Sequence, residues 1–317
     1  MKKRLFYIVL LTCSAMMSWA DDSQKVMTFL KIPTSAHAAA LGGDNISIIE
    51  DDATLALSNP ALLASVSHKT VSLGYMNYMS GVHTGTAGYT HVINEKLTVG
   101  GSIQYANYGS LKQRDANNND LGSFSPMDIV FEPMVAYTLA KNLVGGVGGK
   151  FIYSKIGSYT STAAAIDLGL NYYNPELDFS ASITLKNLGG QLSAYNDEYE
   201  SLPTDVLVGV TKSLGETVPF RVSLTMCDLG HWNYSFLQHA CIGVDLILTP
   251  QFYIAGGYNL RRAHEMKVSN GTDGESSHGA GFGVGAGLNL ERFHLNVAYG
   301  KYHVSSSSFM VNLSFTL

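Results

Sequence analysis

Beyond its first 20 residues, the sequence lacks any apolar run that approaches the roughly 18 residues of a membrane-spanning helix. If the chain crosses a membrane, it therefore does so with strands. Charged residues are also scarce, at 14% of the 317 residues, whereas tyrosines number 18 and glycines 32. This composition fits a secreted β protein or an outer-membrane β-barrel.

Motifs for catalysis, metal binding and nucleotide binding are missing as well. The ten histidines show no metal-ligand spacing, and no Gly-x-Ser-x-Gly motif marks a nucleophile. The glycine-rich run 145–150 is followed by Phe151 where a phosphate loop needs Ser or Thr, and the glycines of 279–285 fall within a strand pattern. Residues 115–126 resemble a calcium loop but carry Asp120 at the sixth position, which requires glycine. We therefore expect no enzyme activity, no metal and no cofactor.

The first 20 residues have the layout of a cleavable signal peptide. A basic start at residues 2–4 precedes an apolar stretch and Ser-Trp-Ala at residues 18–20. We expect cleavage after Ala20 and export of the remainder. Cys13 suggests a lipoprotein instead, but its apolar core would be very short. Cleavage leaves 17 basic against 25 acidic residues, a net charge of −8, which disfavours nucleic acid as a partner.

From residue 69 onward the chain falls into segments of about ten residues with alternating apolar and polar side chains. This is the length that a tilted strand needs to cross a bilayer. Ile103 and Tyr105, for example, alternate with Ser102 and Gln104. Fourteen strands are expected, at residues 69–78, 84–93, 97–108, 128–139, 143–155, 162–173, 177–187, 204–214, 219–227, 239–248, 251–261, 279–290, 292–302 and 308–317.

The connections between these strands alternate short and long. Tight turns, as at 94–96 and 140–142, alternate with longer stretches. The long stretches are 109–127, 188–203, 228–238 and 262–278. Short periplasmic turns and long outer loops are typical of outer-membrane barrels. We therefore predict an all-β fold, a transmembrane antiparallel β-barrel of about 14 strands over residues 69–317; the alternative is a secreted sandwich or a soluble barrel.

Several single residues of the strands carry separate expectations. Pro133 lies inside the fourth strand, where it cannot donate a hydrogen bond, so we expect a β-bulge. Cys227 and Cys241 fall on the inward face of adjacent strands, opposite one another, and are predicted to form a disulfide. Charged residues of both signs are expected to face the lumen, pair with one another and hold a plug; they are Glu132, Lys150, Asp167, Asp178, Arg221 and Asp245.

Residues 21–68, between the leader and the strands, include the only long segment without strand alternation. Thr34 or Ser35 can cap a short helix through an alanine run, which two glycines can end in the left-handed conformation. A second helical turn is expected near 51–57, ended by an Asn-Pro pair. We predict that residues 21–68 form a plug or hatch for the barrel. Its motif residues are Gly42, Gly43, Asn59, Pro60 and Ala61.

Three motifs of this segment resemble a known family. They read Phe-Leu-x-Ile-Pro-x-Ser-Ala at 29–36, Ala-Leu-Gly-Gly at 40–43 and Asn-Pro-Ala-Leu-Leu at 59–63. The set resembles the start of mature PorQ proteins of the type IX secretion system, which are relatives of the FadL-type outer-membrane barrels. The sister PorV proteins tend to carry Asp-Ala-Arg-Ala-Gly in the first motif, where this chain reads Ser-Ala-His-Ala-Ala.

The resemblance implies a non-enzymatic role in the outer membrane of a Gram-negative bacterium, among its lipids and lipopolysaccharide. PorQ-like barrels belong with PorU, PorV and PorZ in a surface attachment complex, and this barrel would anchor a PorZ-like subunit through its outer loops. Aromatic residues are favoured interface anchors; the loop residues expected to bind the partner are Tyr195, Tyr199, His231, Trp232 and Tyr234. A FadL-like channel for uptake of hydrophobic small molecules and a PorV-like cargo shuttle are the alternatives, because a fold alone does not specify function.

Overall fold

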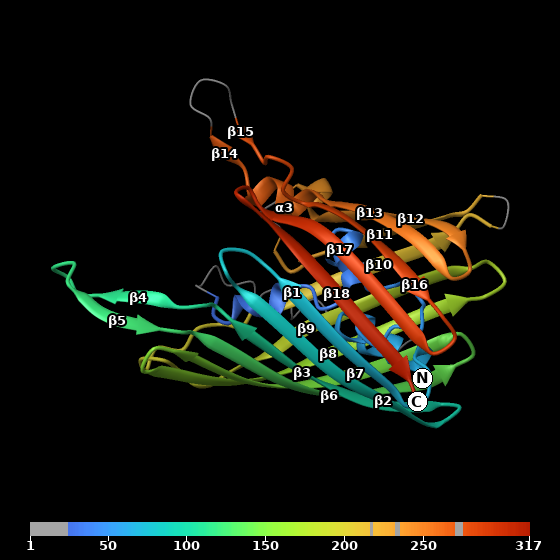
Figure 1. Cartoon of the computed structure of the whole chain (residues 1–317). Coiled ribbons are helices and arrows are strands. Elements are labelled where there is room, and N and C mark those ends of the chain that lie inside the picture. The colour runs from blue at the N-terminus through green and yellow to red at the C-terminus, as the bar shows by residue number, and fades with distance from the viewer. Residues whose placement is uncertain (1–24, 216–217, 232–234, 270–274) are drawn as a thin grey trace.

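Fourteen antiparallel strands close into a barrel in which each strand pairs with its neighbours and the first pairs with the last (Figure 1). The computed structural model describes residues 25–215, 218–231, 235–269 and 275–317. The expected signal peptide, residues 1–20, lies outside the described residues. The barrel strands are β1 Thr70–Asn77, β2 His83–Asn94, β3 Leu97–Asn107, β6 Met127–Ala140, β7 Leu143–Ile156, β8 Tyr159–Asn174, β9 Phe179–Ser193, β10 Asp205–Ser213, β11 Phe220–Met226, β12 Ala240–Thr249, β13 Phe252–Asn259, β16 Phe282–Asn289, β17 Phe293–His303 and β18 Ser306–Thr316. The closed 14-stranded barrel confirms the predicted fold class.

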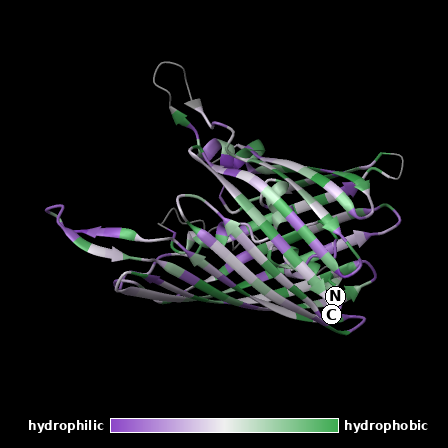
Figure 2. Cartoon of the chain, in the orientation of Figure 1, coloured by the Kyte–Doolittle hydropathy of each residue, from purple (hydrophilic) through white to green (hydrophobic). Residues whose placement is uncertain are grey.

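The two faces of the strands divide as the alternation predicts. In β3, Ile103 is 53% exposed on the outside, whereas Ser102 is 5% exposed on the inside. In β18, Phe309 and Phe315 are exposed and Asn312 is buried. Figure 2 shows apolar and polar residues alternating along the strands. The outer surface is therefore apolar, which suits contact with lipid acyl chains.

Exposed aromatic residues occur toward both ends of the strands. Tyr89, Tyr137 and Tyr172 lie toward the end with the short turns, and Tyr75 and Tyr105 lie toward the opposite end. Aromatic rings at two levels are typical of a barrel surface that crosses two membrane–water interfaces. None of the helices in the described part of the chain is long and apolar enough to cross a membrane.

The long loops meet at the end of the barrel opposite the C-terminus (Figure 1). Two of them contain hairpins that the alternation pattern did not predict. One hairpin is β4 Leu111–Arg114 with β5 Asp120–Phe124, and the other is β14 Val268–Ser269 with β15 Glu275–Ser276. The remaining loop elements are η5 Phe236–His239 and α3 Leu260–Glu265. Both hairpins extend away from the barrel wall in Figure 1.

The expected bulge at Pro133 is wrong. On one side, Pro133 stays in register with Gly101 of β3. On the other side, pairing with β7 is interrupted at Glu132 and Pro133, yet it resumes at Met134 without a register shift. The missing donor of one proline is thus accommodated by a local gap in the ladder.

Closure of the barrel predicts heat modifiability. Every strand has a partner on both sides, so the fold should resist detergent at room temperature and unfold on boiling. We expect unboiled protein to migrate differently from boiled protein in a denaturing gel, and circular dichroism to show mainly strand. Purification as a water-soluble protein without detergent would contradict a membrane barrel.

Candidate functional site

Residues 25–66 lie inside the barrel, and we call them the inner segment (Figure 1). It contains η2 Thr28–Lys31, α2 Ala36–Ala40, η3 Leu55–Leu57 and η4 Pro60–Ser65. All five residues of α2 are buried, and this short helix packs on β13, β16, β17 and β18. The helix η4 packs on β3, β6, β7 and β8, so the inner segment contacts most of the barrel circumference.

The motif around α2 fixes the first half of the inner segment. Ser35 caps the helix by accepting a hydrogen bond from the amide of Ala38 at 3.3 Å. Gly42 and Gly43 follow the helix with φ angles of 100° and 106°, which favour glycine. The carbonyl of Gly42 accepts a hydrogen bond from Arg262 at 2.8 Å, so this turn is joined directly to helix α3 of an outer loop.

The Asn-Pro-Ala motif fixes the second half. Asn59 accepts a hydrogen bond from the amide of Ala61 at 3.0 Å and donates one to the carbonyl of Ile46 at 2.9 Å. Pro60 is the first residue of η4, a position where its missing amide donor costs nothing. The pair thus begins a helix in addition to ending the preceding turn. Asn59 also joins two distant parts of the inner segment to each other.

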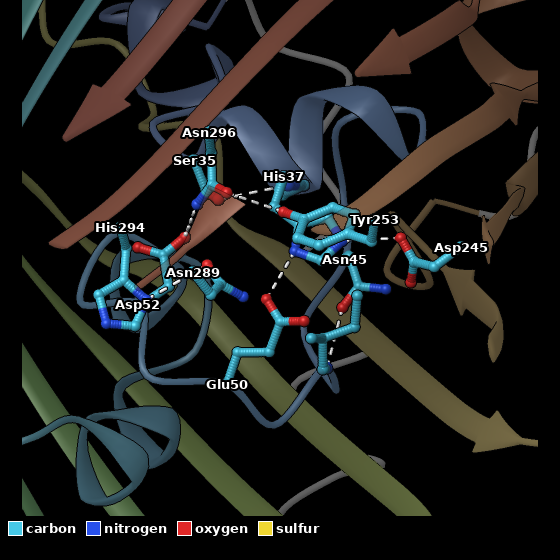
Figure 3. A network of polar contacts seen from close by, with 12 residues as sticks. Ser35, His37, Asn45, Glu50, Asp52, Asp245, Tyr253, Asn289, His294 and Asn296 are labelled. Carbon is cyan, nitrogen blue, oxygen red and sulfur yellow. Dashed lines mark hydrogen bonds and ion pairs between the residues drawn. The ribbon is translucent and has the colours of Figure 1, made fainter. Parts of the chain in front are cut away.

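A buried ion network connects the inner segment to the barrel wall (Figure 3). Both ring nitrogens of His37 lie 2.8 Å from a carboxylate, Nδ1 from Glu50 and Nε2 from Asp245 of β12. Arg221 of β11 donates to the same two carboxylates, at 2.6 Å to Glu50 and 2.8 Å to Asp245. Tyr253 of β13 stacks on the imidazole with ring centroids 4.3 Å apart. We call these five residues the lumen network.

The electrostatics of the lumen network keep it ionised. Burial alone would lower the pKa of His37, but the carboxylates of Glu50 and Asp245 outweigh it and raise that pKa to about 10. Burial would raise the pKa of Glu50, yet Arg221 and His37 hold it well below its usual value. His37 is therefore an imidazolium that donates from both nitrogens, and two cations balance two carboxylates.

A second polar cluster lies on the lumen face of β6 to β9. Lys150 of β7 donates to Asp167 of β8 and to the side chain of Asn187, both at 2.7 Å. Asn187 has φ 57° and lies beside a register shift between β8 and β9. Its backbone amide donates a hydrogen bond to the Asp167 carboxylate. Glu132 of β6 is fully buried near this cluster and accepts a hydrogen bond from Gln104 at 3.3 Å.

Five of the six predicted lumen charges therefore face the lumen, and Asp178 does not. Asp178 is exposed in the turn before β9 and has φ 42°, a conformation that aspartate tolerates in turns. The expectation that these charges pair across the wall is met by Lys150 with Asp167 and by Arg221 with Asp245. The inner-segment members of the lumen network, His37 and Glu50, were not predicted.

The structure contradicts the predicted disulfide, because Cys227 and Cys241 are both free and buried. The predicted register was wrong by two residues. Cys241 pairs with Thr225, and the amide of Cys227 donates to the carbonyl of His239. Each thiol donates to a carbonyl instead, Cys227 to His239 at 3.2 Å and Cys241 to Leu41 at 3.3 Å.

The burial of these thiols predicts a simple labelling result. Burial raises the pKa of the Cys227 thiol, so little of the reactive thiolate forms. We expect native protein to resist alkylation and unfolded protein to be alkylated at Cys227 and Cys241 without any reductant, as mass spectrometry of peptides would reveal. If alkylation of the unfolded protein requires prior reduction, Cys227 and Cys241 form the disulfide after all.

The predicted partner-binding residues of the outer loops differ in exposure. Tyr199 is 66% exposed, whereas Tyr195 is half-buried and donates to Ser154 of β7 at 2.5 Å. His231 lies 2.5 Å from Asp228 and 2.9 Å from Lys25. Trp232 and Tyr234 lie outside the described residues.

Two exposed apolar side chains in the same loop were not among the predicted partner-binding residues. Phe236 and Leu237 of η5 are 63% and 70% exposed. The loop beneath them is fixed by contacts of Asp228, which pairs with Arg261 of α3 and with His231. The sequence signal for this site is the run Ser-Phe-Leu-Gln at residues 235–238. Its Ser and Gln form a capping box at the start of η5, and the two apolar residues lie between them.

Comparison with known proteins decides the family. The family described as type IX secretion system protein PorV matches residues 20–209, more than half of the chain. The chain belongs to the PorV family. It is therefore an outer-membrane component of the type IX secretion system.

Solved structures show the same fold as this PorV-family chain. The Pseudomonas putida toluene transporter TodX has a TM-score of 0.57 and 12% identity, covering 88% of this chain and 96% of TodX. The Ralstonia pickettii toluene transporter TbuX has a TM-score of 0.57 and 12% identity over 90% and 98%. A Pseudomonas aeruginosa FadL homologue has a TM-score of 0.55 and 10% identity over 89% and 98%. At these identities the likeness establishes a FadL-like barrel alone. A search of curated proteins found no match to the sequence.

Proposed function

We propose that this PorV-family barrel acts in the manner of PorQ, as a fixed anchor for a PorZ-like subunit of the attachment complex. In this role the inner segment is a permanent plug, and the outer loops bind the partner above the membrane lipids and lipopolysaccharide. PorU and a PorV-like protein would be further members of the same complex. The observation that carries the proposal is the lumen network, because it holds the inner segment in place and leaves the loops as the free binding surface.

The interior argues against the FadL-like alternative, a channel for hydrophobic molecules. A cavity of about 290 Å³ remains beside the inner segment, but charged side chains line it, including Lys31, Asp44, Lys186, Asp205 and Arg262. An apolar solute would have to displace water from these groups without replacing its hydrogen bonds. Strand pairing also closes the whole barrel, and the β6–β7 ladder, although interrupted at Glu132 and Pro133, resumes without a register shift.

The outer loops favour a stable anchor. Phe236 and Leu237 present adjacent apolar side chains on a loop that Asp228 and Arg261 hold in place. Apolar anchors on a preorganised loop bind with little loss of conformational entropy. A cargo shuttle would need to release its partner, whereas an anchor benefits from slow dissociation.

The test is the double variant Phe236→Ser with Leu237→Ser in the native host. We expect the PorZ-like partner to leave the cell surface and to be lost from affinity purifications of the tagged barrel, measured by mass spectrometry. Uptake of a hydrophobic compound should not change. The matched control is Leu111→Ser with Leu121→Ser, which removes two exposed leucines from the β4–β5 hairpin of another outer loop.

Other outcomes would favour the alternatives. If the partner stays bound in the double variant and hydrophobic uptake falls, the channel is the better assignment. If secreted cargo rather than a PorZ-like subunit is lost from the purified complex, the barrel acts as a shuttle. Each result requires that the variant barrel remains heat-modifiable.

A further inference from the structure

The cavity beside the inner segment is lined in part by residues of the outer loops. Its lining includes side chains of β3, β7 and β9, together with residues 30–34, Gly43, Asp44 and Ile46 of the inner segment. From helix α3 and its C-cap, it is lined by Arg261, Arg262, Glu265 and Met266. The cavity is therefore a recess with several charged lining groups at the loop end of the lumen.

Two opposite charges in this recess stand side by side without pairing. Lys186 of β9 and Asp205 of β10 are direct partners in the strand register. Nevertheless, Lys186 donates to the carbonyl of Leu57 at 3.2 Å, and Asp205 accepts a hydrogen bond from the amide of Asp228 at 2.6 Å. Within the described ranges, neither side chain forms an ion pair. The inner segment and an outer loop thus hold an ammonium and a carboxylate apart.

Other lining groups have unused binding capacity. Lys31 is exposed at the recess and has no ion-pair partner within the described part of the chain. The hydroxyl of Tyr302, a residue 4% exposed, has no hydrogen-bond partner among the described residues. Arg262 lies 4.2 Å above the Tyr302 ring and 4.0 Å from Asp44. Buried polar groups are normally satisfied, so the Tyr302 hydroxyl points to a bound polar molecule.

We propose that this recess binds a small zwitterion with an ammonium and a carboxylate on neighbouring atoms, the head group of an α-amino acid. The ligand's ammonium binds Asp205, and its carboxylate binds Lys186 with help from Lys31. The ligand's side chain extends toward Arg262 and Tyr302. This binding does not depend on the partner-anchoring role of the loops.

The arrangement of charges selects this ligand over simpler ones. A purely anionic ligand would pair with the lysines but would be repelled by Asp205 and Asp44. A purely cationic ligand would pair with the aspartates but would be repelled by the lysines. A zwitterion compensates both signs at once. Lys186 and Asp205 are cross-strand neighbours, so one small ligand that carries both charges on the substituents of a single α-carbon can lie between their side chains.

The test is ligand-observed NMR on the full mature chain in detergent, with an equimolar mixture of the twenty amino acids as the probe. We expect saturation transfer to at least one amino acid. Lys186→Met and Asp205→Asn should each weaken binding by at least about tenfold, since each removes one charged hydrogen bond. Lys112→Met, on the exposed β4 strand, is the control and should bind like the unaltered protein.

Derivatives of the bound amino acid test the need for both charges. The methyl ester lacks the carboxylate and the N-acetyl form lacks the ammonium, so neither should compete. Competition by the N-acetyl form would reduce the site to an anion site and overturn the proposal. Absence of transfer from all twenty amino acids to heat-modifiable protein would also overturn it, and would indicate a recess filled only by water.

Discussion

Replacing His37 with alanine is expected to destabilise the barrel by about 3–5 kcal/mol, the usual effect of removing one partner from a buried ion network. Glu50 and Asp245 would then share the single cation of Arg221, and the stacking on Tyr253 would be lost. The measurement is the midpoint of denaturant or thermal unfolding in detergent, followed by heat modifiability. Limited proteolysis should also cut the inner segment of the variant more readily, because the contact that holds α2 is missing.

The control for this variant is His303→Ala. His303 lies near the loop end of β17 and bonds to Ser305 outside the lumen network. Its replacement should leave the unfolding midpoint within the small change usual for surface positions. Equal midpoints for the two variants would mean that the lumen network contributes nothing to holding the inner segment.

The same contact predicts a stability that falls at alkaline pH. The folded-state pKa of His37 is about 10, above its ordinary value of 6.5. The stabilisation is therefore complete below pH 6.5 and is lost as pH rises through about 10. Glu50, whose pKa is lowered, loses its contribution as pH falls below its usual range. In His37→Ala the alkaline decline should be weaker, which unfolding midpoints measured between pH 6 and pH 10 would test.

The barrel strands were predictable because their signal is local. Alternation with period two is written into each ten-residue segment, and the bilayer length limits where a strand begins and ends. Ser102 and Ile103 therefore fall on the expected faces. The hairpins β4–β5 and β14–β15 were not predicted, because short hairpins outside the membrane need no apolar face and so lack the alternation pattern.

Pairing between distant segments was less predictable. The alternation specifies which face a residue occupies but not its height on the neighbouring strand, so Cys227 and Cys241 were placed two residues out of register. His37 and Asp245 are 208 residues apart in the sequence, and only the path of the inner segment brings them together. The position of His37 within an alanine run was the available signal, since one polar side chain in a buried helix requires partners.

A second large effect is expected from Gly146→Val in β7. Gly146 lies on the inward face, where its missing side chain leaves room for the Asn-Pro-Ala motif. A β-carbon placed there would lie 2.6 Å from the carbonyl oxygen of Pro60 and even closer to the backbone of Ala61. Backbone cannot yield as a flexible side chain does, so η4 must leave its position on the wall. We expect the inner segment to become sensitive to protease and the lumen to conduct ions.

Gly149→Val is the control, and it tests whether the effect of Gly146→Val comes from the clash with η4 rather than from any added side chain on β7. Gly149 lies on the same strand, but nothing lies within 4 Å of a β-carbon placed there. This variant should fold, resist protease in the inner segment and remain closed in planar lipid bilayers, whereas Gly146→Val should give ion currents. If both variants stay closed, the inner segment does not seal the lumen. If Gly146→Val conducts ions yet keeps its surface partner, sealing and anchoring are separate properties, because the outer loops bind without a fixed plug.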